Sequence, residues 1–327
     1  MGCFGGGLAT LDRVTVDPAL TETVDLQTRL GAAVVDRDVV RVSGPDAAAY
    51  LQGQLSQDVA GLAVGATTWS FVLQPTGKVD AWGRVTRTAD DTFLLDVDGG
   101  AGEQVETRLR RFLLRTDATV EALDGWRCVA LRGPGAVGAA PAAAVEAGAE
   151  LQVPAGWPDV EAVDLLGPDV TVPGDLPVAD PDAYEALRIA AGVPAMHAEL
   201  TDKTIPAEAG QWVIDASVSF TKGCFTGQEL VARIDSRGGN VPRHLRGVVL
   251  AVAGSTLPPA GAALTVEGAE VGTITSSAHS PTLLTPVALA YVARSVEPNG
   301  EGVAGIVTWD DEQVPALIRS LPLVDRG

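Results

Sequence analysis

The sequence of 327 residues has little of the residue types that build disulfide scaffolds and metal centres. Its three cysteines, Cys3, Cys128 and Cys224, are widely separated and odd in number, which excludes a disulfide framework and favours a reducing compartment. The three histidines lack the short spacings of zinc ligands, and scattered thiols do not suit an iron–sulfur cluster. We therefore expect no metal or cluster to be held by this chain.

Long apolar runs and an excess of basic residues are also missing. The sequence has no uninterrupted apolar run of about 18 residues, and its first residues lack the pattern of a signal peptide. We therefore expect a cytoplasmic protein without a membrane anchor. Lys plus Arg number 23 against 42 Asp plus Glu, and the net charge of −19 would repel phosphate groups. This charge disfavours a broad nucleic-acid surface, including a direct tRNA-binding module.

What the sequence does contain is enough apolar residues, 46%, to bury a sizeable core in two or three domains. One segment, 222–246, departs from the acidic average. It has a net charge of +3, from five basic and two acidic residues: Lys222, Arg233, Arg237, Arg243, Arg246, Glu229 and Asp235. An anionic ligand would be drawn to this segment.

The most unusual stretch is Lys222–Arg233, KGCFTGQELVAR, which holds one of the three cysteines and one of the three lysines. Thr226 and Glu229 have the spacing of a capping box, so a helix is expected to begin there, with Glu229 capping it. The helix dipole and Lys222 would both favour the thiolate of Cys224. The alternative is that Cys224 is a buried cysteine that packs as a small hydrophobic residue.

Periodicity and turn residues predict alternating strands and helices before residue 240. Strands are expected over 34–42, 67–73, 79–86, 93–97, 119–123 and 127–131, with the three between 67 and 97 forming an antiparallel meander. Helices are expected from an N-cap at Ser43, over 102–114, over 136–148 with an interruption at Pro141, and from Pro181 to a stop at Gly192. Residues 156–182, which contain short valine-containing extended pieces, read as irregular surface structure or a subdomain crossover, and Ile205–Glu208 reads as a short loop.

Beyond Pro242 the pattern changes to short strands separated by Gly, Pro and Asn. These strands are expected over 245–252, 263–266, 271–276, 287–292 and 302–309, which suggests a small antiparallel barrel or sandwich. Two tryptophans of the meander, Trp69 and Trp82, are expected to pack in its faces, with stacking on a flat ligand as the alternative.

These residues resemble the YgfZ family of folate-binding proteins, which are relatives of the glycine-cleavage T-protein, an aminomethyltransferase. The resemblance rests on Lys222–Glu229, which matches that family's K-G-C-[YF]-x-G-Q-E signature. It extends in order from about residue 34 to the end, through Val42–Asp46, Leu51–Asp58, Gly77–Val79, Leu187–Gly192 and Ile205–Ala209.

The resemblance implies an α+β fold with two interleaved mixed α/β subdomains and a C-terminal antiparallel β-barrel around a central funnel for tetrahydrofolate. The subdomains would span residues 1–240, with the Pro/Gly-rich crossover near 156–182, and the barrel would span 241–327. The resemblance also implies a folate-binding accessory protein that supports assembly or repair of iron–sulfur enzymes, including those that modify tRNA. Its partners would be folate and iron–sulfur enzymes or assembly proteins.

The same resemblance implies roles for particular residues. Cys224 and Lys222 would be the key reactive residues, facing the folate. Glu208 would accept hydrogen bonds from pterin N–H groups, and Arg188 or Arg233 would hold a glutamate-tail carboxylate. Without the resemblance, a solvated loop glutamate explains Glu208 about as well, and an arginine on a helix is more often paired at the surface. The remaining predicted folate-binding residues are Lys78, Gly223 and Gln228.

The sequence departs from the enzyme branch at one place. Aminomethyltransferases carry an Asp-Asp pair a few residues after the glycine of the hairpin that contains Gly77, and those places fall near Ala81 and Trp82. Asp80 is the nearby carboxylate, but it is displaced along the strand. A displacement of one residue turns a side chain to the opposite face of the sheet. Glycine-cleavage chemistry is therefore doubtful, although a tetrahydrofolate-dependent one-carbon transferase or demethylase acting on a small amine remains the alternative function.

Overall fold

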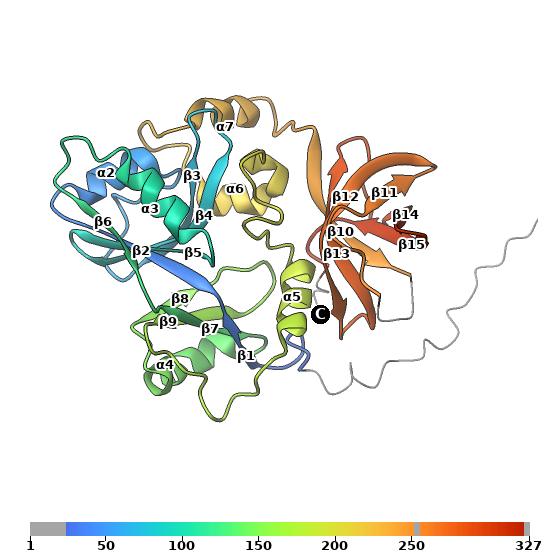
Figure 1. The fold of residues 1–327 in the computed structure, drawn as a ribbon, viewed down its shortest axis with the longest axis horizontal. Coiled ribbons are helices and arrows are strands. Elements are labelled where there is room, and N and C mark those ends of the chain that lie inside the picture. Colours follow the sequence, from blue (N-terminus) through green and yellow to red (C-terminus); the bar gives the residue numbers. More distant parts are fainter. Residues whose placement is uncertain (1–23, 252–255, 324–327) are drawn as a thin grey trace, which may run out of the picture.

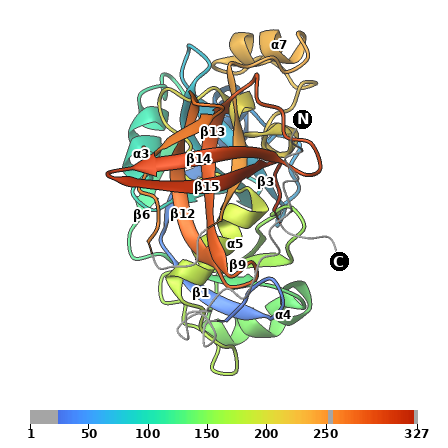
Figure 2. The same cartoon turned by 90° about the vertical axis from the view of Figure 1, so that its right-hand side faces the viewer.

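The computed structural model describes residues 24–251 and 256–323, which form three β-sheets around the centre of the molecule. Two open sheets lie on one side in Figure 1, and a closed barrel lies on the other. Figure 2 looks onto the barrel, with helices α7 and α4 at opposite ends of the molecule. In the described part of the chain, no helix is both long and apolar enough to cross a membrane.

The five-stranded sheet has the order β3-β4-β5-β2-β6, and all its neighbours are antiparallel. Its strands are β2 (Arg37–Ser43), β3 (Thr67–Leu73), β4 (Val79–Ala89), β5 (Thr92–Asp98) and β6 (Thr119–Leu123). Helices α2 (Ala47–Gln54) and α3 (Gly102–Arg110) pack against it. The predicted meander of β3, β4 and β5 is confirmed.

The four-stranded sheet has the order β1-β7-β9-β8 and is also antiparallel. It consists of β1 (Gly31–Val35), β7 (Arg127–Arg132), β8 (Leu151–Pro154) and β9 (Ala162–Gly167), with helix α4 (Ala136–Ala147) packed on it. Because β2 to β6 lie between β1 and β7 in the sequence, one sheet is inserted within the other. The interleaving of the two subdomains is therefore visible in the strand order.

Two predictions for this part were wrong. The single strand expected over 34–42 is divided at Asp36, because β1 pairs with β7 while β2 pairs with β5 and β6. Irregular surface structure is wrong for 156–182, because this segment contains β9, whose six residues are all buried. A strand this short, with an aspartate in its middle, has no alternating pattern that would separate it from a turn.

The barrel closes in the order β10-β13-β12-β11-β14-β15, which confirms the predicted barrel. Its strands are β10 (Arg243–Leu250), β11 (Ala263–Val266), β12 (Ala269–Ser280), β13 (Thr285–Ala293), β14 (Val303–Trp309) and β15 (Glu312–Arg319). Strand β15 was not predicted, because Pro315 lies within it and proline argues against a strand. The division of the chain at residue 240 stays a prediction.

Helix α5 (Pro181–Ala191) lies between the open sheets and the barrel (Figure 1). It begins at Pro181 and ends before Gly192 as predicted, and it packs on β12 and β13 through residues such as Ala186 and Ile189. This position brings the opposite face of α5 to the centre of the molecule.

Other helix predictions needed correction. Helix α2 begins at Ala47, after Asp46 and not after Ser43, because β2 continues through Ser43. Helix α3 ends at Arg110, and α4 continues through Pro141 without interruption. The expected loop Ile205–Glu208 is largely a short 3₁₀ helix, η1 (Pro206–Ala209), and helix α6 (Gln211–Ser217) was missed.

Candidate functional site

The signature loop, residues 219–227, connects α6 to α7 (Gln228–Asp235) and is fastened to helix α2 by Lys222. The Lys222 Nζ donates to the backbone carbonyls of Gln52, Leu55 and Gln57 at 2.7, 2.7 and 2.8 Å. The last carbonyls of a helix lack partners within the helix, and a lysine ammonium has three N–H donors to offer. Lys222 therefore closes the C-terminal end of α2 and holds the loop against it.

Burial affects the charge of this lysine. Partial burial lowers the pKa of Lys222 to about 8, and the carboxylate of Asp58 opposes that shift only in part. The Nζ also lies 5.3 Å from the centre of the Phe225 ring, within the range of a cation–π contact. All three donors of Lys222 are thus engaged within the protein, and its predicted reactive role stays a prediction.

Cys224 is a free, exposed thiol on this loop, so the alternative of a buried packing cysteine is wrong. The predicted capping box is also wrong, because α7 begins at Gln228 and no side chain caps it at Gly227. The side chain of Gln228 instead accepts a hydrogen bond from the backbone N–H of Phe225 at 3.1 Å. Cys224 therefore lies four residues before the helix, and Glu229 is exposed on its first turn.

The hairpin between β3 and β4, which contains Lys78, docks directly on the signature loop. Gly227 is in the left-handed region with φ of 82°, and a Cβ on it would lie 2.5 Å from the carbonyl oxygen of Gln74. A Cβ on Gly77 would lie 2.4 Å from the Cβ of Leu230. Only glycine permits this approach. The structure thus brings Lys78, Lys222, Gly223, Cys224 and Gln228 into one region.

A cavity of about 200 Å³ lies at the centre, between the two open sheets and α5. Its walls are rich in aromatic side chains. The rings of Trp69 and Trp82 stack with centroids 4.0 Å apart, and those of Trp157 and Tyr184 are 5.4 Å apart. The prediction that Trp69 and Trp82 pack is confirmed, because the two rings stack on each other and are buried; both also line the cavity, and stacking on a flat ligand stays a prediction.

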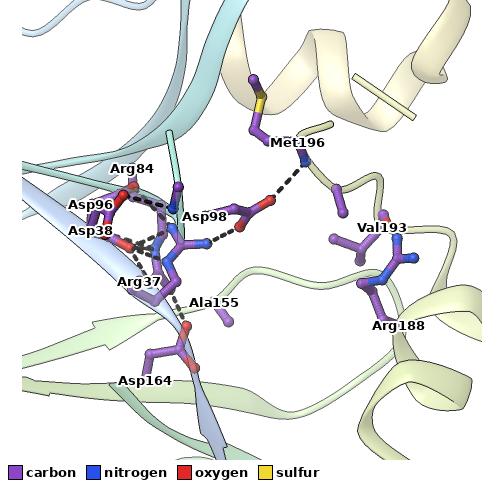
Figure 3. Close-up of polar contacts among 12 residues, drawn as sticks. Arg37, Asp38, Arg84, Asp96, Asp98, Ala155, Asp164, Arg188, Val193 and Met196 are labelled. Atoms are coloured by element: carbon purple, nitrogen blue, oxygen red, sulfur yellow. Dashed lines mark hydrogen bonds and ion pairs between the residues drawn. The ribbon is translucent and has the colours of Figure 1, made fainter. Parts of the chain in front are cut away.

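Buried ion pairs support this cavity. Arg37 pairs with Asp96 at 2.6 Å and with Asp98, and Arg84 pairs with Asp96 and Asp164 at 2.6 Å each. The other oxygen of Asp98 accepts the backbone N–H of Met196 at 2.9 Å. Figure 3 shows Asp98 between Arg37 and Met196, with Arg188 on the opposite side of this region.

The buried Asp164 joins strands of both open sheets. Arg132 donates to one of its oxygens at 2.7 Å and Arg84 to the other at 2.6 Å. Burial alone would raise the pKa of Asp164, but Arg132 and Arg84 outweigh it and hold that pKa well below its usual range. The sequence offers one indication of this network, since Asp164 lies within a short apolar strand and Arg132 ends another, but it does not show that the two residues pair.

Arg188, a predicted binder of the folate tail, lines the same cavity from α5. All five of its N–H groups are engaged: Nε and Nη2 donate to Glu185, Nη1 donates to Glu199 and to the carbonyl of Val193, and Nη2 also donates to Ser276. A tail carboxylate would have to displace one of these acceptors.

The other two predicted residues lie elsewhere. Glu208, in η1, is 2% exposed and accepts hydrogen bonds from Ile205 N at 3.3 Å and from Arg243 Nη2 at 3.1 Å. Arg233 is exposed on α7. Among the predicted site residues, all of which the structure describes, Arg188 alone lines the central cavity. The roles given to Glu208 and Arg233 stay predictions.

Asp80 and Trp82, in the hairpin between β3 and β4, lie near the places that correspond to the Asp-Asp pair of the enzyme branch. Asp80 lies at an irregularity in the β3–β4 pairing, and its side chain pairs with Nε of Arg108 on α3 at 3.2 Å. Trp82 lies in the cavity wall, where its Nε1 donates to Ser217 Oγ at 2.8 Å. Asp80 does not line the central cavity.

Comparison with known proteins agrees with this architecture. The GCVT N-terminal domain family matches residues 26–153, and the glycine cleavage T-protein C-terminal barrel domain family matches residues 243–325. The crystal structure of glycine cleavage system aminomethyltransferase T from Bartonella henselae has a TM-score of 0.72 at 21% identity, covering 93% of this chain and 89% of that one. The fold is therefore that of the aminomethyltransferase class, as predicted.

Comparison with curated proteins indicates which family within this fold class the chain resembles. An uncharacterized protein of Haemophilus influenzae is 30% identical, with 62% of this chain covering 67% of that protein. The tRNA-modifying protein YgfZ of Edwardsiella ictaluri is 29% identical (62% of this chain, 65% of that protein). An iron-sulfur cluster assembly factor IBA57 homolog, mitochondrial, of Pyricularia oryzae is also 29% identical (63% and 54%). This chain belongs to the YgfZ family, which is related to the glycine-cleavage T-protein.

Proposed function

We propose that this protein is a cytoplasmic folate-binding accessory protein that supports the assembly or repair of iron–sulfur enzymes, including enzymes that modify tRNA. The relatives named as a tRNA-modifying protein and as an iron-sulfur cluster assembly factor support this function. The observation that carries it is the exposed thiol of Cys224, on a loop fastened by three hydrogen bonds from Lys222. A thiol held in this way is accessible to a partner protein.

The chemistry of Cys224 would be that of a soft ligand or nucleophile towards iron or sulfur. Within residues 24–251 and 256–323, no three potential metal ligands come together. The iron or sulfur atom would therefore be supplied by the partner, with Cys224 approaching it as one ligand. The partners we propose are iron–sulfur enzymes or their assembly proteins.

Folate would bind at the central cavity, whose chemistry suits part of such a molecule. Stacked tryptophans offer flat apolar contact, and the buried arginines offer hydrogen-bond donors. When bound, tetrahydrofolate supplies a carrier for one-carbon units. This chain would bind and orient it, with Arg188 as the predicted contributor that lines the cavity. Glu208, Lys78, Gly223, Gln228 and Arg233 lie outside the cavity, so their predicted contribution would require a part of the ligand that extends beyond it.

Complementation in cells that lack the endogenous protein tests the role of Cys224. We expect Cys224→Ser and Cys224→Ala to lose rescue of iron–sulfur enzyme activity while keeping the melting temperature of the wild type, because the thiol is exposed. Glu229→Gln, an exposed substitution five residues away, is the matched control and should rescue fully. Full rescue by both Cys224 variants would overturn the proposed role.

The one-carbon transferase remains the competing function, favoured by the fold of the Bartonella aminomethyltransferase. The wall position of Trp82 and the outward pairing of Asp80 disfavour it, because neither leaves a carboxylate for proton transfer in the cavity at this hairpin. Incubating the protein with tetrahydrofolate and small amine donors separates the two functions. Formation of a methylene or formyl adduct would favour the transferase.

A further inference from the structure

Arg246, on strand β10, is half-buried and has no hydrogen-bond or ion-pair partner among the described residues. Its Nε is buried, so its two Nη groups are the donors that a ligand can reach. Burial lowers the pKa of Arg246, and the carboxylate of Glu297 opposes that shift only in part. A charge that is partly removed from water without a partner is costly. Arg246 therefore lacks a counter-charge within the described part of the chain.

The side chain of Arg246 belongs to the inner face of the barrel. Val248 is part of the apolar core inside the barrel, whereas Leu245 packs with residues of α5 outside it. Because side chains alternate along a strand, His244 and Arg246 share the inner face with Val248. The residue opposite Arg246 on β13 is Ala290, which belongs to the same core. His244 and Arg246 thus lie at the mouth of the barrel, at the end where the chain enters β10 from α7 (Figure 1).

Positive charge gathers at this mouth, although the whole chain has a net charge of −19. The imidazole of His244 also has no hydrogen-bond partner among the residues that the structure describes. Burial lowers the pKa of His244, and the charges of Arg246 and Arg294 lower it further. The carboxylates that oppose this shift are Glu297, which is exposed, and Glu208, which is already in an ion pair. The mouth therefore attracts anions.

The missing hydrogen bonds and the missing charge together determine which ligand fits. The Nη groups of an arginine suit two oxygens of a carboxylate or a phosphate, and a neutral imidazole donates one further N–H. An uncharged acceptor would satisfy these donors but would leave the half-buried charge of Arg246 uncompensated. A metal ion or an ammonium group would be repelled by Arg246 and Arg294. An oxyanion is the chemical group that meets both requirements.

We propose that the barrel mouth is a binding site for one oxyanion group, a carboxylate or a phosphate, held by the Nη groups of Arg246 and the imidazole of His244. Arg294, which is exposed and donates to Asn240 Oδ1 at 2.6 Å, adds positive charge beside it. The site is separate from the central cavity, which neither Arg246 nor His244 lines. It goes beyond the proposed function, because it gives the barrel a ligand of its own that does not depend on folate.

Proton NMR of the histidines tests this site on the unmodified protein, because the chain has only three of them and His244→Gln assigns the signal. Sodium phosphate or sodium acetate replaces sodium chloride at pH 7 and constant ionic strength. We expect the His244 signal to shift and saturate, and its pKa to rise, because a bound anion favours the imidazolium. The exposed His197 is the internal control. If neither probe moved His244 differently from His197, the proposal would be wrong.

The two probes also distinguish the source of the ligand. Preference for phosphate would indicate a phosphorylated ligand, and preference for acetate would indicate a carboxylate such as an acidic side chain of a protein partner. Either preference, or equal binding of both, supports the oxyanion site.

Three variants test which residues form the site. Arg246→Gln should weaken binding at least about 10-fold, because it removes the charge and the paired donors. Arg237→Gln, which changes an exposed cation just after α7, is the matched control and should bind like the wild type. Glu297→Gln should bind more tightly, since it removes a nearby negative charge. Undiminished binding by Arg246→Gln would overturn the role of Arg246. Binding by Glu297→Gln but not by the wild type would show that Glu297 is the natural partner of Arg246, and the proposal would fail.

Discussion

The signature loop depends on a half-buried lysine and the central cavity on fully buried arginines, and the two regions balance these cations differently. At the loop, Lys222 donates to three backbone carbonyls and has no carboxylate partner within ion-pair distance among the described residues. At the cavity, Arg84 and Arg132 share the carboxylate of Asp164, and Arg84 also pairs with Asp96. The loop thus exposes a thiol from a firm support, whereas the local stability of the cavity depends on charge balance. Substitutions should accordingly affect function at the loop and stability at the cavity.

The largest expected effect comes from Asp164→Asn. This change leaves Arg132 buried without its carboxylate partner and Arg84 paired with Asp96 alone, and breaking a buried ion pair in this way costs about 3–5 kcal/mol. Urea denaturation followed by tryptophan fluorescence measures the change. Cys224→Ser changes an exposed side chain on the signature loop, and it should change the unfolding free energy by about 0.5 kcal/mol or less. Equal effects of the two substitutions would remove the distinction between the regions.

The carboxylate of Asp164 should also make the stability of the protein depend on pH in the acidic range. Its folded-state pKa lies below the ordinary value of 3.8, so its contribution is fully present above about pH 4 and is lost as the pH falls through the folded-state pKa. The Asn variant should therefore lose less stability than the wild type on acidification. A parallel loss in both proteins would show that Asp164 is not held by its arginines.

A smaller effect is expected at the glycine contact between the hairpin and the loop. Gly227→Ala places a Cβ at a positive φ and 2.5 Å from the Gln74 carbonyl oxygen, which should cost about 2 kcal/mol. Thiol alkylation of Cys224 should change as well, because the loop must shift. Gly223→Ala is the matched control: its Cβ would meet nothing within 4 Å, and its stability should stay near that of the wild type. If Gly227→Ala left the unfolding free energy unchanged, the hairpin would not constrain the loop.

The two regions also differ in how far the sequence predicts them. Cys224 and its neighbours lie in one continuous stretch, so their resemblance to a family signature can be recognised from the residues alone. Even there the capping of α7 was mispredicted, because a Thr-x-x-Glu spacing cannot show that Gly227 adopts a left-handed conformation. The family resemblance predicted the fold class, and strand patterns predicted most of the barrel.

The ion pairs around the cavity could not be predicted from the sequence, for a physical reason. Arg132 and Asp164 stand 32 positions apart and Arg84 a further 48, and the three residues lie in three different strands of two sheets. Pairing of such residues depends on the order of strands in two sheets, which no local pattern determines. The division of residues 34–42 between β1 and β2 was missed for the same reason, since it depends on which partner each half pairs with.

The smallest expected effect concerns the charge of Lys222, the cation that fastens the signature loop. Burial disfavours the ammonium of Lys222 and lowers its pKa to about 8, whereas the three accepting carbonyls favour the charged form. With only three lysines in the chain, ¹³Cε-labelled protein should show a signal with a midpoint near pH 8 that Lys222→Arg removes. Because the folded-state pKa lies below the ordinary value of 10.5, the folded protein releases this proton first, and stability from this group should rise between pH 8 and 10.5. The Arg variant, which stays charged, should not share that rise. A midpoint at or above about pH 10 would instead show that the carbonyls offset burial, and Lys222 would then titrate as an ordinary lysine.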